Sequence, residues 1–193
     1  MQHLNIKANF LISIIFKLLL LTTINGYAAE EPKVLYWDAL IPKDWNPNSV
    51  FEKFTDEELR EMSDEQYFEL QKKAQKMQDA APTVDSLDGQ TVSIPGFLLP
   101  LEFDKATIKE FLLVPYFGAC THTPPPPANQ VIHGKLQSEL TINELYDPVW
   151  ITGKIKILRS QSKLGETGIA QTINVNTGYT MEVDEVTPYQ DEN

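Results

Sequence analysis

The chain has 193 residues, of which 16 are lysine or arginine and 27 are aspartate or glutamate, so its formal net charge is −11. This acidity disfavours nucleic acid and anionic lipid surfaces as partners, because both are bound through clustered lysine and arginine side chains. Cations and basic peptides are compatible partners, although solubility alone is sufficient to explain the charge.

The first 28 residues have the three-part pattern of a secretory signal peptide. A lightly basic start precedes an apolar stretch from Phe10 to Leu21, and Gly26 and Ala28 are the small residues before the expected cleavage site. Lys17 interrupts the apolar stretch, which is shorter than the roughly 20 residues of a spanning helix. We therefore expect export to the periplasm without stable membrane insertion. Removal of this peptide deletes two lysines and no acid, which leaves 165 residues with 14 basic and 27 acidic side chains, a net charge of −13.

The mature chain is expected to fold as one globular unit in two parts. Residues 29–82 form an extended arm and helices, and residues 83–193 form a β-rich domain packed with them. Within the first part, segment 34–47 carries aromatic residues between prolines. Because prolines disfavour a regular helix, this segment is expected to be an extended arm that docks on the domain.

Two consecutive helices are expected after the arm. Thr55 with Glu58, and Ser63 with Gln66, have the spacing at which a hydroxyl and a carboxylate or amide cap a helix start reciprocally. The second helix carries an apolar stripe at steps of three and four residues, which predicts a contact with the core and consists of Tyr67, Leu70, Ala74 and Met77.

After residue 82 the apolar period changes to two, which predicts strands. Pro95-Gly96 bends the first strand, as at the corner of a small barrel. The fold class is therefore α+β: a small, curled, antiparallel barrel of the oligonucleotide/oligosaccharide-binding (OB) type, preceded by the aromatic arm and the helical segment. The polar stretch 160–178 is expected to be a long loop. The expected strands are 91–101, 108–116, 149–158 and 179–186.

A distinctive motif follows the second expected strand. Cys120 is the only cysteine, so it cannot form an internal disulfide in the periplasm. On an extended backbone, Cys120 and His122 project from the same face, and the four prolines 124–127 favour a rigid polyproline II helix behind them. Thiolate and imidazole together suit zinc or copper, with further ligands from carboxylates or from His133. A complete zinc signature with paired Cys-x-x-Cys is absent from the sequence.

Two other interpretations of the motif remain open. Cys120 could pack as a small apolar side chain while His122 hydrogen-bonds loop backbone. Alternatively, Cys120 could be the nucleophile of an enzyme with His122 as its base, oriented by a carboxylate such as Asp38 or Asp44. A third hypothesis is a purely structural envelope interaction domain that uses the exposed aromatic arm as its contact.

The leading interpretation is a periplasmic, non-enzymatic accessory or binding protein. Its Cys120–Gln130 loop is expected to contact a metal ion, with zinc as the candidate, or an envelope partner protein. The candidate metal ligands are Cys120 and His122. Asn129 and Gln130 complete the candidate binding residues, and their amides are suited to holding the proline loop in place.

Three stretches of the sequence carry a resemblance to known proteins: YWDALIPKDWNP (36–47), IPGFLLPLE (94–102) and FLLVPYFGACTHTPPPPANQ (111–130). In these stretches the chain resembles a family of uncharacterised secreted proteobacterial proteins, a domain of unknown function, over nearly the whole mature length. The resemblance implies a periplasmic accessory protein linked to transporter components and metal supply. Cys120 and His122 match the family's Cys-x-His pair, whereas His133 stands where an aromatic residue is expected.

Overall fold

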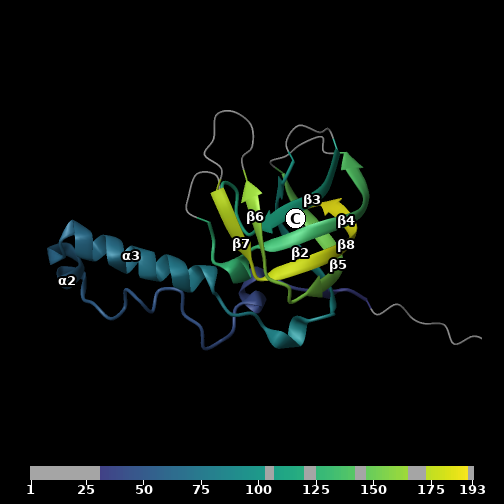
Figure 1. Ribbon diagram of the computed structural model, residues 1–193. Helices are drawn as coiled ribbons and strands as arrows, with labels where there is room; N and C mark the ends of the chain where they lie inside the picture. The colour runs from purple at the N-terminus through teal and green to yellow at the C-terminus, as the bar shows by residue number, and fades with distance from the viewer. Residues whose placement is uncertain (1–30, 103–106, 120–124, 142–146, 165–172, 191–193) are drawn as a thin grey trace, which may run out of the picture. The chain divides into compact units, whose positions relative to one another are not determined.

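The computed structural model describes residues 31–102, 107–119, 125–141, 147–164 and 173–190 (Figure 1). The chain divides into two compact units, Met1–Glu31 and Pro32–Asn193, and the second holds all the helices and strands described below. The predicted signal peptide, residues 1–28, lies outside the described residues. Among the described residues, no helix is long and apolar enough to cross a membrane.

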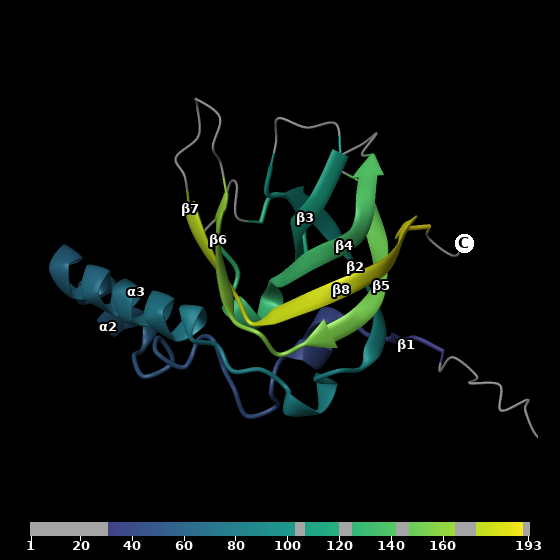
Figure 2. The same ribbon diagram turned by 45° about the vertical axis from the view of Figure 1, so that its right-hand side comes forward.

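The centre of the second unit is a closed barrel of five strands (Figure 2). Their order around the barrel is β2 (Thr91–Pro100), β3 (Thr107–Val114), β4 (Ile132–Thr141), β8 (Tyr179–Pro188) and β5 (Pro148–Lys156). Antiparallel pairing of β5 with β2 closes the ring of described strands. This architecture confirms the expected small OB-like barrel.

Three details of the β region differ from the expectation, the first being that β4 is a strand that the sequence analysis did not predict. The barrel is not wholly antiparallel, because β4 and β8 run parallel. The stretch 160–178 is not a long loop, because its described parts form β6 (Ser160–Leu164) and β7 (Ile173–Thr177), an antiparallel pair separate from the barrel sheet. The sequence of this pair shows no alternation of apolar and polar residues, because polar residues such as Ser162 and Thr177 occupy buried positions.

The bend at Pro95-Gly96 lies where β2 changes its partner. Residues Thr91 to Phe97 of β2 pair with β5, and residues from Phe97 onward pair with β3. A Cβ atom at Gly96 would lie 2.8 Å from the carbonyl oxygen of Val114, so the approach of β3 requires glycine here. The expected role of the bend in turning the barrel corner is confirmed.

Two apolar clusters hold the unit together. The larger fills the barrel and includes the fully buried Phe111, Ile151 and Tyr179. The smaller lies on the other face of β3, where Leu112 and Val114 pack with side chains of β6 and β7. Alternate residues of β3 thus face opposite clusters, which explains why four consecutive residues of this strand, 111–114, are all buried.

The arm docks on the barrel as expected, although it is not extended throughout. Strand β1 (Lys33–Val34) pairs in parallel with β2, and a 3-10 turn, η1 (Trp37–Leu40), follows it. Leu35 and Leu40 are buried, and the indole N–H of Trp37 donates a hydrogen bond of 2.7 Å to the carbonyl oxygen of Pro95. A second 3-10 turn, η2 (Asp85–Leu87), precedes β2.

Both predicted helices are present with their capping boxes. Helix α2 (Asp56–Glu61) begins after Thr55 and helix α3 (Asp64–Asp79) begins after Ser63, and each cap side chain accepts from the backbone N–H three residues on. The prediction that an apolar stripe of α3 contacts the core is largely wrong, because Ala74 is the only buried residue of this helix and Tyr67 is 41% exposed. The helix lies outside the barrel and packs on the preceding segment, where the Ser49 hydroxyl donates to the Met77 sulfur.

Candidate functional site

The motif around Cys120 and His122 lies partly outside the described residues, because 120–124 are among those not described. The geometry of the expected Cys120–His122 pair is therefore untested. Within the described residues, no group of three or more His, Cys, Asp or Glu side chains could hold a metal ion. The described residues on either side of the motif define how its ends are held.

The upstream end is packed on the barrel. Ala119 is fully buried and belongs to the smaller apolar cluster beside Val114. Gly118 has a φ of 80°, a left-handed conformation that favours glycine, so the chain turns sharply just before the buried alanine. The ring of Phe117 contacts that of Phe97 edge to face, at 6.0 Å between centroids. These contacts fix the chain up to residue 119.

The downstream end is held by hydrogen bonds to three different segments. Pro127 has φ −52° and ψ 148°, close to polyproline II, and leads into the 3-10 turn η3 (Ala128–Gln130). The carbonyl oxygen of Ala128 accepts from the Gly178 backbone N–H at 2.6 Å. The side-chain amides of the next two residues also donate, from Asn129 to the Pro82 carbonyl oxygen and from Gln130 to that of Trp37, both at 2.9 Å.

Asn129 and Gln130 thus connect the loop to the arm and to the segment before β2. Asn129 is completely buried, and its Oδ1 atom has no hydrogen-bond partner among the described residues. Both side-chain amides donate to backbone carbonyl groups, so they act here as anchors of the loop. A buried amide that donates to a backbone carbonyl stabilises one loop conformation at little entropic cost once the chain is folded.

The remaining candidate ligand, His133, lies in a hydrogen-bonded chain on the outer face of the barrel. Its Nε2 atom lies 2.9 Å from a carboxylate oxygen of Glu110, and its Nδ1 atom lies 3.3 Å from the Ser160 hydroxyl. Ser160 in turn lies 2.7 Å from the hydroxyl of Thr177, and Lys135 lies 3.4 Å from the other Glu110 oxygen. Both ring nitrogens of His133 are therefore engaged, which leaves neither free for a metal in this arrangement.

The order of serine, histidine and carboxylate is superficially that of a nucleophile, its base and an orienting acid. Ser160, however, shares its hydroxyl with Thr177, the last residue of β7, which is almost completely buried. His133 is itself buried. The chain of contacts thus serves as a polar latch that fastens the β6–β7 hairpin to β3 and β4. No backbone pairing joins that hairpin to the barrel in the described part of the chain.

The contacts of the latch lower the pKa of the Glu110 carboxyl. Burial raises the pKa of the Glu110 carboxyl, but the hydrogen bond to His133 and the charges of Lys135 and His133 outweigh it, so the pKa lies below the ordinary value of 4.5. A carboxyl whose pKa is lower in the folded than in the unfolded chain stabilises the fold above the unfolded pKa. This contribution is lost as the pH falls through the lower folded pKa.

We expect Glu110→Gln to weaken the acid sensitivity of the fold. The melting temperature of the parent should fall between about pH 5 and pH 3, whereas the variant, with no carboxyl to protonate at this position, should fall less over that range. Thermal denaturation across the pH series is the measurement. Glu69→Gln removes an exposed carboxylate on α3 and is the control. Parallel pH profiles of parent and Glu110→Gln would contradict the role of the latch.

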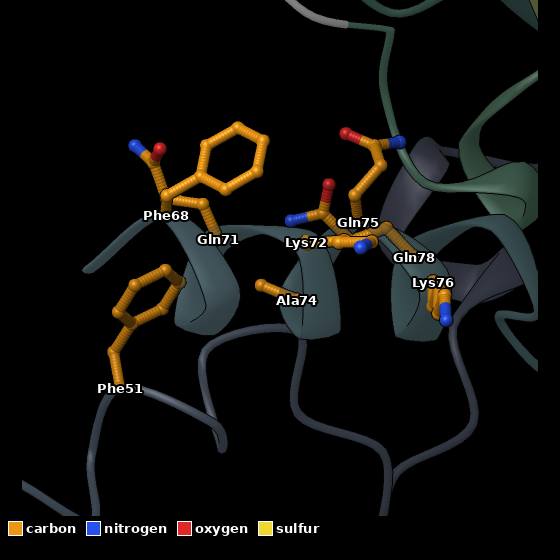
Figure 3. A pocket seen from close by; sticks show the side chains of 8 residues that line it. All are labelled: Phe51, Phe68, Gln71, Lys72, Ala74, Gln75, Lys76 and Gln78. Carbon is orange, nitrogen blue, oxygen red and sulfur yellow. The ribbon is translucent and has the colours of Figure 1, made fainter. Parts of the chain in front are cut away.

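A separate groove lies along α3 (Figure 3). Its volume is about 560 Å³, and Phe68 on the helix and Phe51 on the preceding segment form its apolar end. Among the described residues that line the groove are Lys72 and Lys76 together with three glutamines. This lining offers apolar contact and hydrogen-bonding groups.

Sequence reasoning missed the partners of His133. Glu110 follows Lys109 in a strand whose next four residues are buried, so a carboxylate at this position was the available signal that the outer face of β3 carries a polar contact. Ser160 gave no signal, because it lies in the polar stretch expected to be a loop.

The fold and these contacts define a small OB-like barrel protein with a docked N-terminal arm and a constrained proline-rich loop. The chain belongs to the DUF3299 family, described as proteins of unknown function, since the family model matches residues 37–188. A crystal structure of a DUF3299 family protein from Pseudomonas aeruginosa PAO1 is similar, with 32% sequence identity and a TM-score of 0.58. The similarity covers 84% of this chain and 99% of that chain. A comparison with curated proteins gave no match.

Proposed function

We propose that the protein is a non-enzymatic binding module of the bacterial envelope that takes up a transition-metal ion, zinc as the candidate, through Cys120 and His122. In this proposal PYFGAC-x-H-x-PPPP-x-NQ is the signature of the family's binding loop. The module acts as an accessory to an envelope partner such as a transporter component.

The observation that carries the proposal is the fixing of both ends of segment 120–124. Ala119 on one side and Pro126 on the other are buried, and Asn129 and Gln130 donate to backbone carbonyl groups of other segments. Holding the residues on both sides of a binding loop reduces the entropic cost of ordering that loop on a ligand, which favours affinity. A thiol and an imidazole two residues apart provide a soft ligand pair at that place.

Metal content is the direct test. The purified protein should carry about one zinc per chain after dialysis, and Cys120→Ser or His122→Ala should each weaken zinc binding by at least about tenfold, since each removes one of roughly four ligands. His133→Gln is the matched control, because it removes the other mature histidine, whose ring nitrogens are already hydrogen-bonded. Elemental analysis and competition with a chelating dye measure the effect.

Melting temperatures distinguish the metal proposal from a purely structural role of Cys120. If Cys120 only fills an apolar pocket, Cys120→Ser would lower the melting temperature, because it buries a hydroxyl, and parent and variants would all be free of metal. That result would end the metal proposal. The rate of alkylation by iodoacetamide across a pH series tests the enzyme hypothesis. A nucleophilic cysteine reacts at pH values well below the ordinary thiol pKa of about 8.5, whereas an ordinary thiol does not.

Periplasmic location is part of the same proposal and has its own test. The mature protein should begin at or near Ala29, because Gly26 and Ala28 occupy the two positions that must be small for processing. N-terminal sequencing of protein from the periplasmic fraction checks this expectation. Recovery of chains that keep Met1 in the membrane fraction would contradict it.

A further inference from the structure

Three aromatic side chains from distant parts of the sequence meet on the outside of the barrel. Trp150 on β5 stacks with Tyr189, just beyond β8, at 5.8 Å between ring centroids and 21° between planes. Tyr36 from the arm meets Trp150 edge to face, at 6.4 Å and 67°. Tyr36 is 59% exposed and Tyr189 is 38% exposed. These three residues are called the aromatic surface.

The polar groups of the aromatic surface are not used within the described part of the chain. The hydroxyls of Tyr36 and Tyr189 and the indole N–H of Trp150 make no hydrogen bond among the described residues. Trp37, one residue from Tyr36, differs because its N–H donates to the Pro95 carbonyl oxygen. The aromatic surface therefore offers apolar ring faces together with three unused hydrogen-bond donors.

Exposed carboxylates lie close to the ring-bearing residues in the chain and in the strand register. Glu185 is exposed on β8 and pairs in register with Thr152, two residues from Trp150 on the same face of β5. Asp147 is exposed next to Pro148, whose carbonyl oxygen accepts from the Tyr189 backbone N–H.

The arm adds a further exposed carboxylate, Asp38, two residues from Tyr36. Lys33 at the start of the arm and Lys154 on β5 offset part of this charge, since Glu182, the register partner of Lys154, forms its ion pair with Lys156. The three carboxylates still outnumber the two lysines.

We propose that the aromatic surface binds a proline-rich segment of a partner protein that carries lysine or arginine. A polyproline II segment has unpaired backbone carbonyl groups, which indole N–H and tyrosine O–H groups can satisfy, and its prolines pack on aromatic rings. The carboxylates select for basic side chains between the prolines and against acidic ones. This surface does not involve Cys120, so the inference is independent of the metal proposal.

Labelled synthetic peptides test the inference on the purified protein. A proline-rich peptide with lysine at every third position should bind saturably, and the same peptide with glutamate in place of lysine should bind at least about tenfold more weakly. Binding of the lysine peptide should weaken as salt is raised, because the carboxylates are exposed. Fluorescence anisotropy of the peptide gives the dissociation constants.

Variants locate the binding site. Tyr36→Ala and Tyr189→Ala should each weaken binding of the lysine peptide by about tenfold, as expected for central aromatic contacts. Phe68→Ala is the matched control, since it truncates an aromatic residue on α3 that is 61% exposed, and it should leave binding unchanged. Equal melting temperatures establish that the variants are folded.

Three outcomes would overturn the inference. One is no saturable binding of the lysine peptide, and another is equal binding of the lysine and glutamate peptides. The third is binding that Tyr36→Ala and Tyr189→Ala leave unchanged. Binding of a β-linked oligosaccharide in place of the peptide would assign the aromatic surface to glycan and would also overturn it.

Discussion

Gly153→Val is expected to lower the free energy of unfolding by more than about 3 kcal/mol, a large part of the stability of a domain of this size. Gly153 lies in β5 where the pairing with β8 shifts register. A Cβ atom there would lie 2.9 Å from Val183 Cα and would overlap the Glu182 carbonyl oxygen. Both neighbours are backbone atoms, so relief requires β5 and β8 to separate.

Chemical denaturation followed by circular dichroism measures this effect, and Gly89→Ala is the comparison. Gly89 has a φ of 77° in the turn before β2, but a Cβ atom there would meet nothing within 4 Å. Its replacement should cost about 1 kcal/mol from backbone strain alone. A loss for Gly153→Val no greater than that for Gly89→Ala would show that β5 and β8 are not held as closely as described.

The strands that the sequence predicted show either a local alternation of apolar and polar residues or, in β3, an unbroken apolar run. In β2 the residues from Thr91 to Pro100 alternate between partly exposed and buried, and β5 shows the same pattern around Ile151. Strand β4 was missed because Gly134 stands at one of its inward positions. Phe111 of β3 fills the space where a side chain at Gly134 would lie. The sequence around Gly134 therefore shows no apolar side chain at this buried position, because the side chain that fills it comes from β3.

The candidate site likewise has features that the local sequence predicts and features that arise only in the folded chain. Local chemistry was sufficient to suggest that the amides of Asn129 and Gln130 hold the loop. The latch could not be foreseen, since Glu110 and Ser160 are 23 and 27 residues from His133 and meet it only through the register of the folded chain. The aromatic surface has the same origin, because Trp150 acquires its neighbours when the arm and β8 reach β5.

Tyr179→Phe is expected to lower the free energy of unfolding by about 2–4 kcal/mol, although it removes a single oxygen atom. The Tyr179 ring is fully buried in the larger apolar cluster. Its hydroxyl donates to the Leu40 carbonyl oxygen at 3.0 Å and accepts from the Val84 backbone N–H at 2.7 Å. Phenylalanine keeps the packing of the ring but leaves both backbone groups without this partner.

The loss should appear first in the arm. The Tyr179 hydroxyl joins the arm, through Leu40, to the segment before β2, so hydrogen exchange and proteolysis of the arm should rise more than those of the barrel strands. Tyr36→Phe is the matched control, because the Tyr36 hydroxyl makes no hydrogen bond among the described residues. It should leave the stability and the exchange of the arm unchanged.

The free energy of unfolding at alkaline pH gives an independent test of the role of the Tyr179 hydroxyl. Burial raises the pKa of Tyr179 above 10.0, and Asp85 raises it further, against the opposing effects of the Val84 N–H and Arg159. A tyrosine whose folded pKa is raised contributes stability that is present below the unfolded pKa of about 10 and is lost as the pH rises through the folded value. The stability difference between parent and Tyr179→Phe should therefore shrink above about pH 10. A difference that stays constant into the alkaline range, or an arm that exchanges no faster in the variant, would show that the hydroxyl does not join these two segments.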